Sequence, residues 1–310
     1  MVKVLVSTVN QNLEDWLSIK NKYVSATDAT TILGANKFKT PMQLYLEKTG
    51  LIEREKVTSD AAHFGTILEP VVADEFTRRT GIKLRKRNAI LQHDTEDWVI
   101  GNVDRLVIGE NVGFEAKTTS AYNLKEWQDE EIPPGYIIQC QWYMYLTGYE
   151  SWWIACLVGG QKFIYKKIER DDELIEIVVE RCREFWFENV KKNIPPSFDG
   201  SEASTNLLGR LYPKAEKESE IELPGEAEEL IQKLEEAKEY EKVWSENKKL
   251  AENQLKALLG NFETGYANDY VITWKNVNSN RVDSMLLKEQ YPEIYQAVCK
   301  ENASRRFSIK

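Results

Sequence analysis

Hydrophobic and polar residues follow a helical spacing in the first eighty residues of the chain. Thr27 and Asp28 are suited to cap a helix that ends at Gly34, and Pro41 is suited to begin a second helix that ends at Gly50. A third helix is predicted over residues 60–81, where apolar residues recur at the spacing of one helical face: Phe64, Leu68, Val71, Val72 and Phe76.

The spacing then becomes that of strands. "NAILQH", "DWVIGNVDRLVIG" and "FEAKTT" alternate or run apolar, and the turn "ENVG" joins the last two. The length of "YIIQCQWYMYLTG" favours a helix ending at Gly148, and residues 151–169 predict a hairpin around Gly159-Gly160. "DDELIEIVVERCREFWFENV" predicts an amphipathic helix. This order of elements predicts a mixed α/β layer fold for about the first two hundred residues.

A second region, residues 216–310, is predicted after a first domain of residues 1–215. Its main feature is a long helix with heptad spacing, formed by Leu230, Leu234, Ala237, Glu241, Trp244, Lys248, Ala251, Leu255 and Leu258. Glu241 and Lys248 interrupt the apolar seam, so a helix lying on its own domain and an intermolecular coiled coil both remain open. "YVITWK" and the final "RRFSIK" predict strands that flank short helices.

Composition narrows the class of protein. The 310 residues are 42% hydrophobic and 29% charged, with no apolar run long enough to cross a bilayer and no secretory signal at the start. A cytoplasmic protein is therefore expected. The net charge of -9 argues against coating nucleic acid by bulk electrostatics but leaves a local groove possible. The four cysteines are spaced too widely for a disulfide framework or a zinc or iron–sulfur site.

The segment "GNVDRLVIGENVGFEAKTTS" contains the candidate chemistry. Side chains alternate along a strand, so Glu115 and Lys117 share a face, and Asp104 can lie opposite or diagonal to them across the hairpin. Two converging carboxylates repel each other unless a cation neutralises them, and hard oxygen ligands suit magnesium or manganese. The lysine can orient a water and offset charge on a phosphate.

A plainer interpretation explains the same residues on pattern alone. Glu115 and Lys117 can form an ion pair on an exposed strand, with Asp104 a solvated turn acid. Glu69, within the preceding amphipathic helix, can likewise be a helix-edge glutamate. However, the order helix acid, strand acid, strand acid-x-lysine is the order used by one large group of nucleases.

The ordered motifs "ATDATTILG", "TPMQLYLEKTG", "FGTILEPVVADEF", "GNVD", "FEAKT" and "QCQWYMYLTG" resemble the YqaJ-type viral recombinases, lambda exonuclease-like members of the PD-(D/E)xK nucleases. The resemblance covers about residues 12–195. It implies a restriction endonuclease-like core, a central mixed sheet flanked by helices, here followed by a helical C-terminal extension with a small strand pair.

The resemblance also implies roles for individual residues. Asp104 and Glu115 match the metal-binding acids, with the backbone carbonyl of Ala116 as a further ligand, and Lys117 matches the catalytic lysine. Glu69 matches a helix glutamate that assists the metal site. Gln139 and Gln141 match the "QxQ" glutamines, which contact the metal-site water or the DNA phosphate; without the family, they are polar positions on a buried helix.

A 5′-phosphate pocket is implied near the amino end. Trp16, Lys20 and Thr27 have the spacing of the family's tryptophan, basic residue and hydroxyl, and Asn102 can add a donor. Lys20 stands where the lambda enzyme has arginine, which loses a bidentate grip on phosphate. Val103 stands where the motif often has proline.

The implied activity is a magnesium-dependent 5′-to-3′ exonuclease on linear double-stranded DNA, with manganese as a possible substitute for magnesium. It leaves 3′ single strands for a phage single-strand annealing protein, in a bacterial host cell. A homotrimer is expected by resemblance. A structure- or site-specific endonuclease and a non-cleaving scaffold that binds DNA ends are the alternatives.

Overall fold

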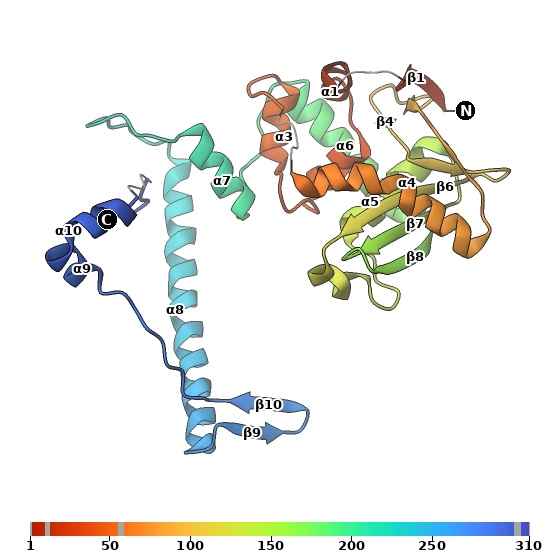
Figure 1. Ribbon diagram of the computed structural model, residues 1–310. Coiled ribbons are helices and arrows are strands. Elements are labelled where there is room, and N and C mark those ends of the chain that lie inside the picture. The colour runs from red at the N-terminus through yellow and green to blue at the C-terminus, as the bar shows by residue number, and fades with distance from the viewer. Residues whose placement is uncertain (1, 10–12, 55–58, 301–304, 310) are drawn as a thin grey trace. The chain divides into compact units, whose positions relative to one another are not determined.

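The computed structural model describes residues 2–9, 13–54, 59–300 and 305–309 (Figure 1). The chain divides into two compact units, Met1–Leu211 and Tyr212–Lys310. Each unit has its own sheet and helices, and the predicted nuclease motifs all fall in the first.

A five-stranded sheet forms the centre of the first unit (Figure 1). Its strand order is β2-β5-β6-β7-β8, in which β6 and β7 are parallel and the other pairs antiparallel. The strands are β2 (Leu84–Lys86), β5 (Arg105–Val107), β6 (Val112–Thr119), β7 (Ser151–Val158) and β8 (Lys162–Glu169). The predicted hairpin around Gly159-Gly160 is present, with both glycines at positive φ.

A smaller antiparallel sheet has the order β1-β3-β4, with β1 (Lys3–Ser7), β3 (Ala89–Gln92) and β4 (Ile100–Gly101). The chain leaving β4 reaches β5 through residues 102–104. The segment with Asn102 and Asp104 is therefore held between the two sheets.

Helices cover both faces of the five-stranded sheet. Helix α4 (Asp60–Thr80) buries Val72, Ala73 and Phe76 against Phe114 of β6 and Ala155 of β7. On the other face α5 (Pro134–Thr147) belongs to a larger core and packs against α2 (Ala26–Ile32) and α6 (Asp172–Glu184). The remaining elements are α1 (Leu13–Asn21), α3 (Pro41–Lys48), α7 (Glu202–Leu211), a 3-10 helix (Ala121–Trp127) and a π-helical turn (Phe185–Val190) that continues α6. The predicted mixed α/β core is confirmed.

Two details of the helix predictions are wrong. Phe64 and Val71 of α4 are about half exposed, because only the C-terminal half of the helix reaches the sheet. The N-cap of α2 is Ser25 rather than Thr27 or Asp28, and the Asp28 carboxylate accepts hydrogen bonds from the Ser25 amide and hydroxyl. Thr27 and Asp28 thus lie in the first turn, where their side chains serve the surrounding polar network.

The second unit contains the predicted long helix, α8 (Glu226–Leu259), followed by the antiparallel pair β9 (Thr264–Ala267) and β10 (Tyr270–Thr273). Short helices α9 (Ser284–Gln290) and α10 (Pro292–Val298) follow. The strand prediction for "RRFSIK" is wrong for residues 305–309, which form no strand, and Lys310 lies outside the described residues. The strand that pairs with "YVITWK" comes instead from the segment directly after α8.

None of the helices in the described ranges is long and apolar enough to cross a membrane. The four cysteines are free thiols, of which Cys299 is exposed and the other three are buried.

Candidate active site

Asp104, Glu115 and Lys117 meet where β5 and β6 begin to diverge. Arg105 pairs with Phe114 in the antiparallel ladder, so the preceding residue Asp104 lies at the level of Glu115. The Asp104 Oδ2 atom accepts a hydrogen bond of 3.0 Å from the Ala116 amide. The two carboxylates therefore converge, as the hairpin pattern predicted.

Alternation along β6 sends its side chains to different layers. Phe114 and Ala116 pack in the cluster under α4, whereas Glu115 and Lys117 point toward α5 on the other face. Glu115 is 3% exposed, which rules out the plainer interpretation of an ion pair on an exposed strand. The Lys117 Nζ atom lies 2.5 Å from Glu115 Oε1.

Gln139 of α5 joins this pair. Its Oε1 accepts a hydrogen bond of 3.1 Å from Lys117, and its Nε2 donates one of 2.6 Å to Glu115 Oε1. The buried amide thus fixes the orientation of both charged groups.

Two tyrosines of α5 lie beside Lys117 and Gln139, and the sequence analysis identified neither. The Tyr143 hydroxyl accepts a hydrogen bond from Gln139 Nε2 and donates one to the Asn102 carbonyl. The Tyr136 ring lies 5.0 Å from Lys117 Nζ, in a cation–π geometry. Their spacing from Gln139, three residues before and four after, was the available signal, since such residues share one helical face.

The electrostatics of the acid pair are unfavourable without a cation. Burial and the neighbouring Asp104 raise the pKa of Glu115 to about 8, although Lys117 opposes the shift. Burial alone would lower the pKa of Lys117, but Glu115 and Asp104 raise it overall, so the lysine stays charged.

The donor set fits a divalent cation that prefers oxygen. Glu115 Oε2 is buried and has no hydrogen-bond partner among the described residues. Across those residues no group of three His, Cys, Asp or Glu side chains could hold a metal ion. Two carboxylates with main-chain, water or substrate oxygens match Mg²⁺, which keeps several waters in protein sites.

Glu69 is near this pair but does not join it. Its Oε1 atom lies 3.2 Å from the Nη2 atom of Arg105. The Arg105 side chain projects to the face of the sheet that α4 covers. Burial and the charge of Asp104 raise the pKa of Glu69, although Lys86 and Arg105 oppose the shift. The Glu69 assignment therefore needs the Arg105 contact to rearrange.

Gln141 is not at the site, which corrects the sequence interpretation. Its Nε2 donates to the Glu169 carbonyl at 2.9 Å, and its Oε1 accepts from the Asp171 amide at 3.1 Å. Two residues along a helix turn a side chain away by about 200°. Gln141, 2% exposed, joins α5 to the connection between β8 and α6.

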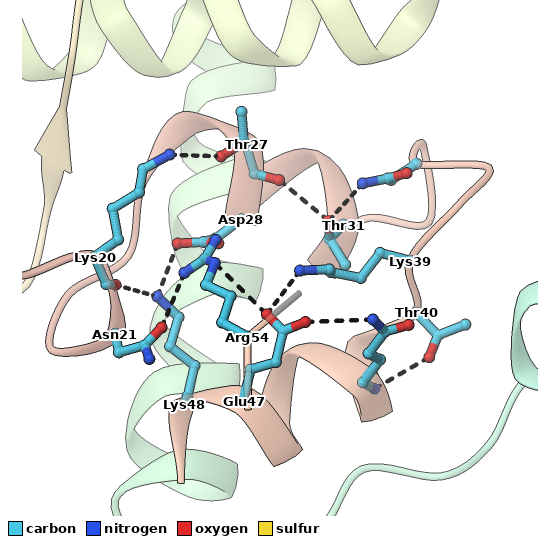
Figure 2. A network of polar contacts seen from close by, with 12 residues as sticks. Lys20, Asn21, Thr27, Asp28, Thr31, Lys39, Thr40, Glu47, Lys48 and Arg54 are labelled. Atoms are coloured by element: carbon cyan, nitrogen blue, oxygen red, sulfur yellow. Dashed lines mark hydrogen bonds and ion pairs between the residues drawn. The ribbon is translucent and has the colours of Figure 1, made fainter. Parts of the chain in front are cut away.

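Lys20 and Thr27 come together on α1 and α2, as the resemblance implied. The Lys20 Nζ donates to Thr27 Oγ1 at 3.3 Å and lies 4.1 Å from the centroid of the Trp16 ring (Figure 2 shows the lysine and threonine). Burial lowers the pKa of Lys20 to about 7 despite the nearby carboxylate of Asp28.

A buried ion network holds this corner together (Figure 2). Asp28 accepts from Lys48 at 2.8 Å and from Arg54 at 3.2 Å, and Lys48 also donates to the main-chain carbonyls of Lys20 and Tyr23. Burial opposes ionisation of Asp28, but Lys48 and Arg54 lower its pKa overall. The network therefore fixes the end of α1 against the first turn of α2, where Thr27 lies.

Comparison with known proteins identifies the family of the chain. Residues 15–150 match the family model described as the YqaJ-like viral recombinase domain. The chain is 42% identical to an uncharacterized protein YqaJ of Bacillus subtilis (strain 168), over 99% of this chain and 97% of that protein. The chain belongs to the YqaJ-like viral recombinase family.

Solved structures show the fold of this family member. An alkaline exonuclease, LHK-Exo, from Laribacter hongkongensis matches with a TM-score of 0.50 and 20% identity, over 64% of this chain and 100% of that one. LHK-Exo in complex with dAMP matches with a TM-score of 0.51 and 21% identity, over 64% and 97%. The predicted fold of the PD-(D/E)xK type is confirmed.

Proposed function

We propose that this family member is a magnesium-dependent exonuclease that degrades linear double-stranded DNA in the 5′-to-3′ direction and leaves a 3′ single strand. One observation carries the proposal: Glu115 Oε2 is buried beside Asp104 with no hydrogen-bond donor among the described residues, and the Lys117 ammonium lies on the same face of the strand. A purely structural ion pair would not leave a buried carboxylate oxygen unsatisfied.

Asp104, Glu115 and the Ala116 carbonyl would hold the magnesium ion. The ion, when bound, supplies Lewis acidity that activates water and offsets charge on the phosphate, and manganese can replace it. A cation held by both carboxylates would offset their mutual repulsion. The 2.6 Å hydrogen bond from Gln139 to Glu115 Oε1 leaves Oε2 as the oxygen that is available to the ion.

Lys117 orients the attacking water and stabilises charge that develops on the scissile phosphate. Gln139 holds the lysine by its amide oxygen, and Tyr143 holds Gln139, so the ammonium is positioned before DNA arrives. Glu69 assists the metal site once its contact with Arg105 opens.

The proposed direction of digestion rests on Lys20 and Thr27, whose side chains lie together near the amino end. A terminal 5′ phosphate is a dianion that would accept from both groups and restore full charge to Lys20. Asn102 has a buried Oδ1 with no hydrogen-bond partner in the described part of the chain, and its amide end can donate to the DNA. A site that grips the 5′ phosphate selects the strand that is cut.

The partners follow from the family resemblance. They are double-stranded DNA ends and a phage single-strand annealing protein that takes the 3′ strand. A homotrimer that encloses the DNA would keep an acidic protein on its substrate by topology rather than by charge.

The deciding experiment is a magnesium time course on linear duplex DNA labelled at one 5′ end or one 3′ end, beside the same DNA as a closed circle. We expect early loss of the 5′ label, a long 3′-labelled strand and an intact circle. Glu115→Gln measured in parallel should remove the product.

Cutting of the circle would replace the proposal with an endonuclease. No product with magnesium or manganese, together with unchanged DNA binding by Glu115→Gln, would replace it with a scaffold that binds DNA ends.

A further inference from the structure

Helix α8 presents an apolar stripe that its own unit does not cover. The α8 seam consists of Leu230, Leu234, Ala237, Glu241, Trp244, Lys248, Ala251, Leu255 and Leu258. All of these are exposed except the half-buried Leu234, and Trp244 is 70% and Leu258 84% exposed. Of all α8 residues, only Leu259 is buried.

A long helix with an uncovered apolar face is stabilised when that face packs against another surface. A helix of 34 residues is about 51 Å long, and an isolated helix in water gains little from propensity alone. Helices in proteins are stabilised chiefly by packing one face, and the seam has the heptad spacing that packs against another helix.

The α8 seam reads almost the same in both directions. Leu230 and Leu258 lie fourteen residues before and after Trp244, and Ala237 and Ala251 lie seven before and after it. Leu234 and Leu255 lie ten before and eleven after it. An antiparallel second copy centred on Trp244 therefore places leucine beside leucine and alanine beside alanine.

Only one pair of related positions in the seam differs in residue type, and its two residues have opposite charges. Glu241 lies three residues before Trp244 and Lys248 lies four residues after it, so the antiparallel copy brings each acid close to the lysine of the other chain. Within its own helix Lys248 is 3.9 Å from Glu252. The two polar interruptions of the seam thus fit a second copy of the same helix.

Charge is distributed unevenly along α8, with an acidic first half and a basic second half. Residues 226–241 carry seven glutamates and two lysines, whereas residues 242–259 carry four lysines and two glutamates. Antiparallel pairing sets the acidic half of one helix against the basic half of the other, and parallel pairing sets acid against acid. Charge pattern selects orientation in paired helices.

We propose that α8 is a self-association surface, and that its occupant is the α8 helix of a second copy of this chain in antiparallel orientation. The surface is separate from the proposed nuclease site. Pairing through it has two-fold symmetry, so within the proposed homotrimer each α8 pairs with a chain of a second ring, and loss of the pairing halves the assembly.

The first test is the molar mass of the full chain by light scattering on a sizing column at micromolar concentration. Trp244→Glu should halve the mass, because it places a charge at the centre of the seam. Val243→Glu is the matched control, since Val243 is 52% exposed and lies outside the seam. An unchanged mass for Trp244→Glu, or a monomeric parent chain, would overturn the proposal.

The second test is orientation. The variants Leu230→Cys and Leu258→Cys are made in a Cys299→Ser background. Each variant is oxidised alone, and a mixture of the two is oxidised in parallel. Disulfides in the mixture only, between the two variants, support the antiparallel pair, and dimers of Leu230→Cys with itself would show a parallel pair and refute it.

The third test exchanges the charges. Glu241→Lys should weaken self-association about tenfold by turning two attractions into repulsions, and the double variant Glu241→Lys/Lys248→Glu should restore it. Failure of the double variant to recover, with helix content unchanged, would show that the two residues do not face each other.

Discussion

At the scale of single residues, the candidate site is a set of charges that burial makes costly. Glu115 is held by Lys117 and Gln139 on one oxygen and by nothing among the described residues on the other. A buried, half-satisfied carboxylate is kept only where something compensates for its cost. In this site the compensating group is the proposed cation, and the ammonium of Lys117 is left to act on the phosphate.

Lys117→Ala should lower the rate of DNA cleavage by at least about 100-fold, because it removes the positioned cation that faces the developing charge. Binding of duplex DNA in a gel-shift assay should stay close to that of the parent chain. Lys162→Ala, at the exposed first residue of β8, is the control. Full activity of Lys117→Ala would exclude the proposed site.

Lys20 gives a prediction about pH. Burial lowers the pKa of Lys20 to about 7, and a bound phosphate would raise it, so binding takes up a proton above pH 7. The preference for a 5′-phosphorylated end over a 5′-hydroxyl end should therefore decline as pH rises from about 7 to 9.

The measurement is the ratio of cleavage rates on the two ends across that pH range. Lys20→Arg should keep the ratio flat, because arginine stays charged, and Lys20→Ala should remove the preference at every pH. A ratio that falls equally in the parent chain and in Lys20→Arg would point to another group.

At the scale of elements, the site depends on how α1, α2 and α3 are tied together. The side chains of Lys48 and Asp28 are 0% and 2% exposed, and their ion pair joins α3 to α2. Breaking one partner of a buried pair leaves the other charge without compensation.

Asp28→Asn should lower the free energy of unfolding by about 3 to 5 kcal/mol at neutral pH, measured by denaturant titration. The pKa of Asp28 is lowered by folding, so its stabilisation is present above the unfolded pKa of about 4 and is lost as pH falls below it. The difference between parent and variant should shrink on acidification. Glu184→Gln, which breaks an exposed pair with Arg181, should change little.

The pairing of β6 with β7 sets a second constraint. Gly113 lies opposite Trp152, and a Cβ atom at Gly113 would come within 2.2 Å of the indole. Gly113→Ala should cost about 1 to 3 kcal/mol of unfolding free energy and displace the strand that carries Glu115 and Lys117. Gly200→Ala, at a position with open space, is the control, and equal stability of both variants would contradict this account.

At the scale of the whole molecule, the two proposed sites lie in different units. The candidate site and the contacts that hold it lie in Met1–Leu211, whereas the α8 seam lies in Tyr212–Lys310. The proposed chemistry can therefore be tested apart from the proposed α8 pairing.

A chain that ends at residue 211 should keep DNA cleavage per active site within a few-fold of the full chain and lose the assembly that depends on α8. The comparison is the initial rate on linear duplex DNA beside molar mass. A truncated chain that is folded by circular dichroism but inactive would show that the second unit contributes to the site.

The sequence by itself determined most of the elements, because their period and end signals are local. Gly148 ends α5 in a left-handed conformation, Gly159-Gly160 turns the β7–β8 hairpin, and the heptad spacing marks α8. It also placed Glu115 and Lys117 on one face, since alternation along a strand needs no tertiary information. Predictions from periodicity were wrong where packing against another element determines burial or pairing. Phe64 is exposed although its spacing predicted a buried face, and residues 305–309 form no strand.

Only the tertiary structure decided what surrounds those residues. It buried Glu115, brought Gln139 and Tyr143 over it, paired Glu69 with Arg105 and turned Gln141 away. It also assembled Asp28, Lys48 and Arg54 into one network from segments that no spacing connects. The physical reason is that burial and charge pairing depend on which elements lie against each other, and a repeat along one chain does not carry that information.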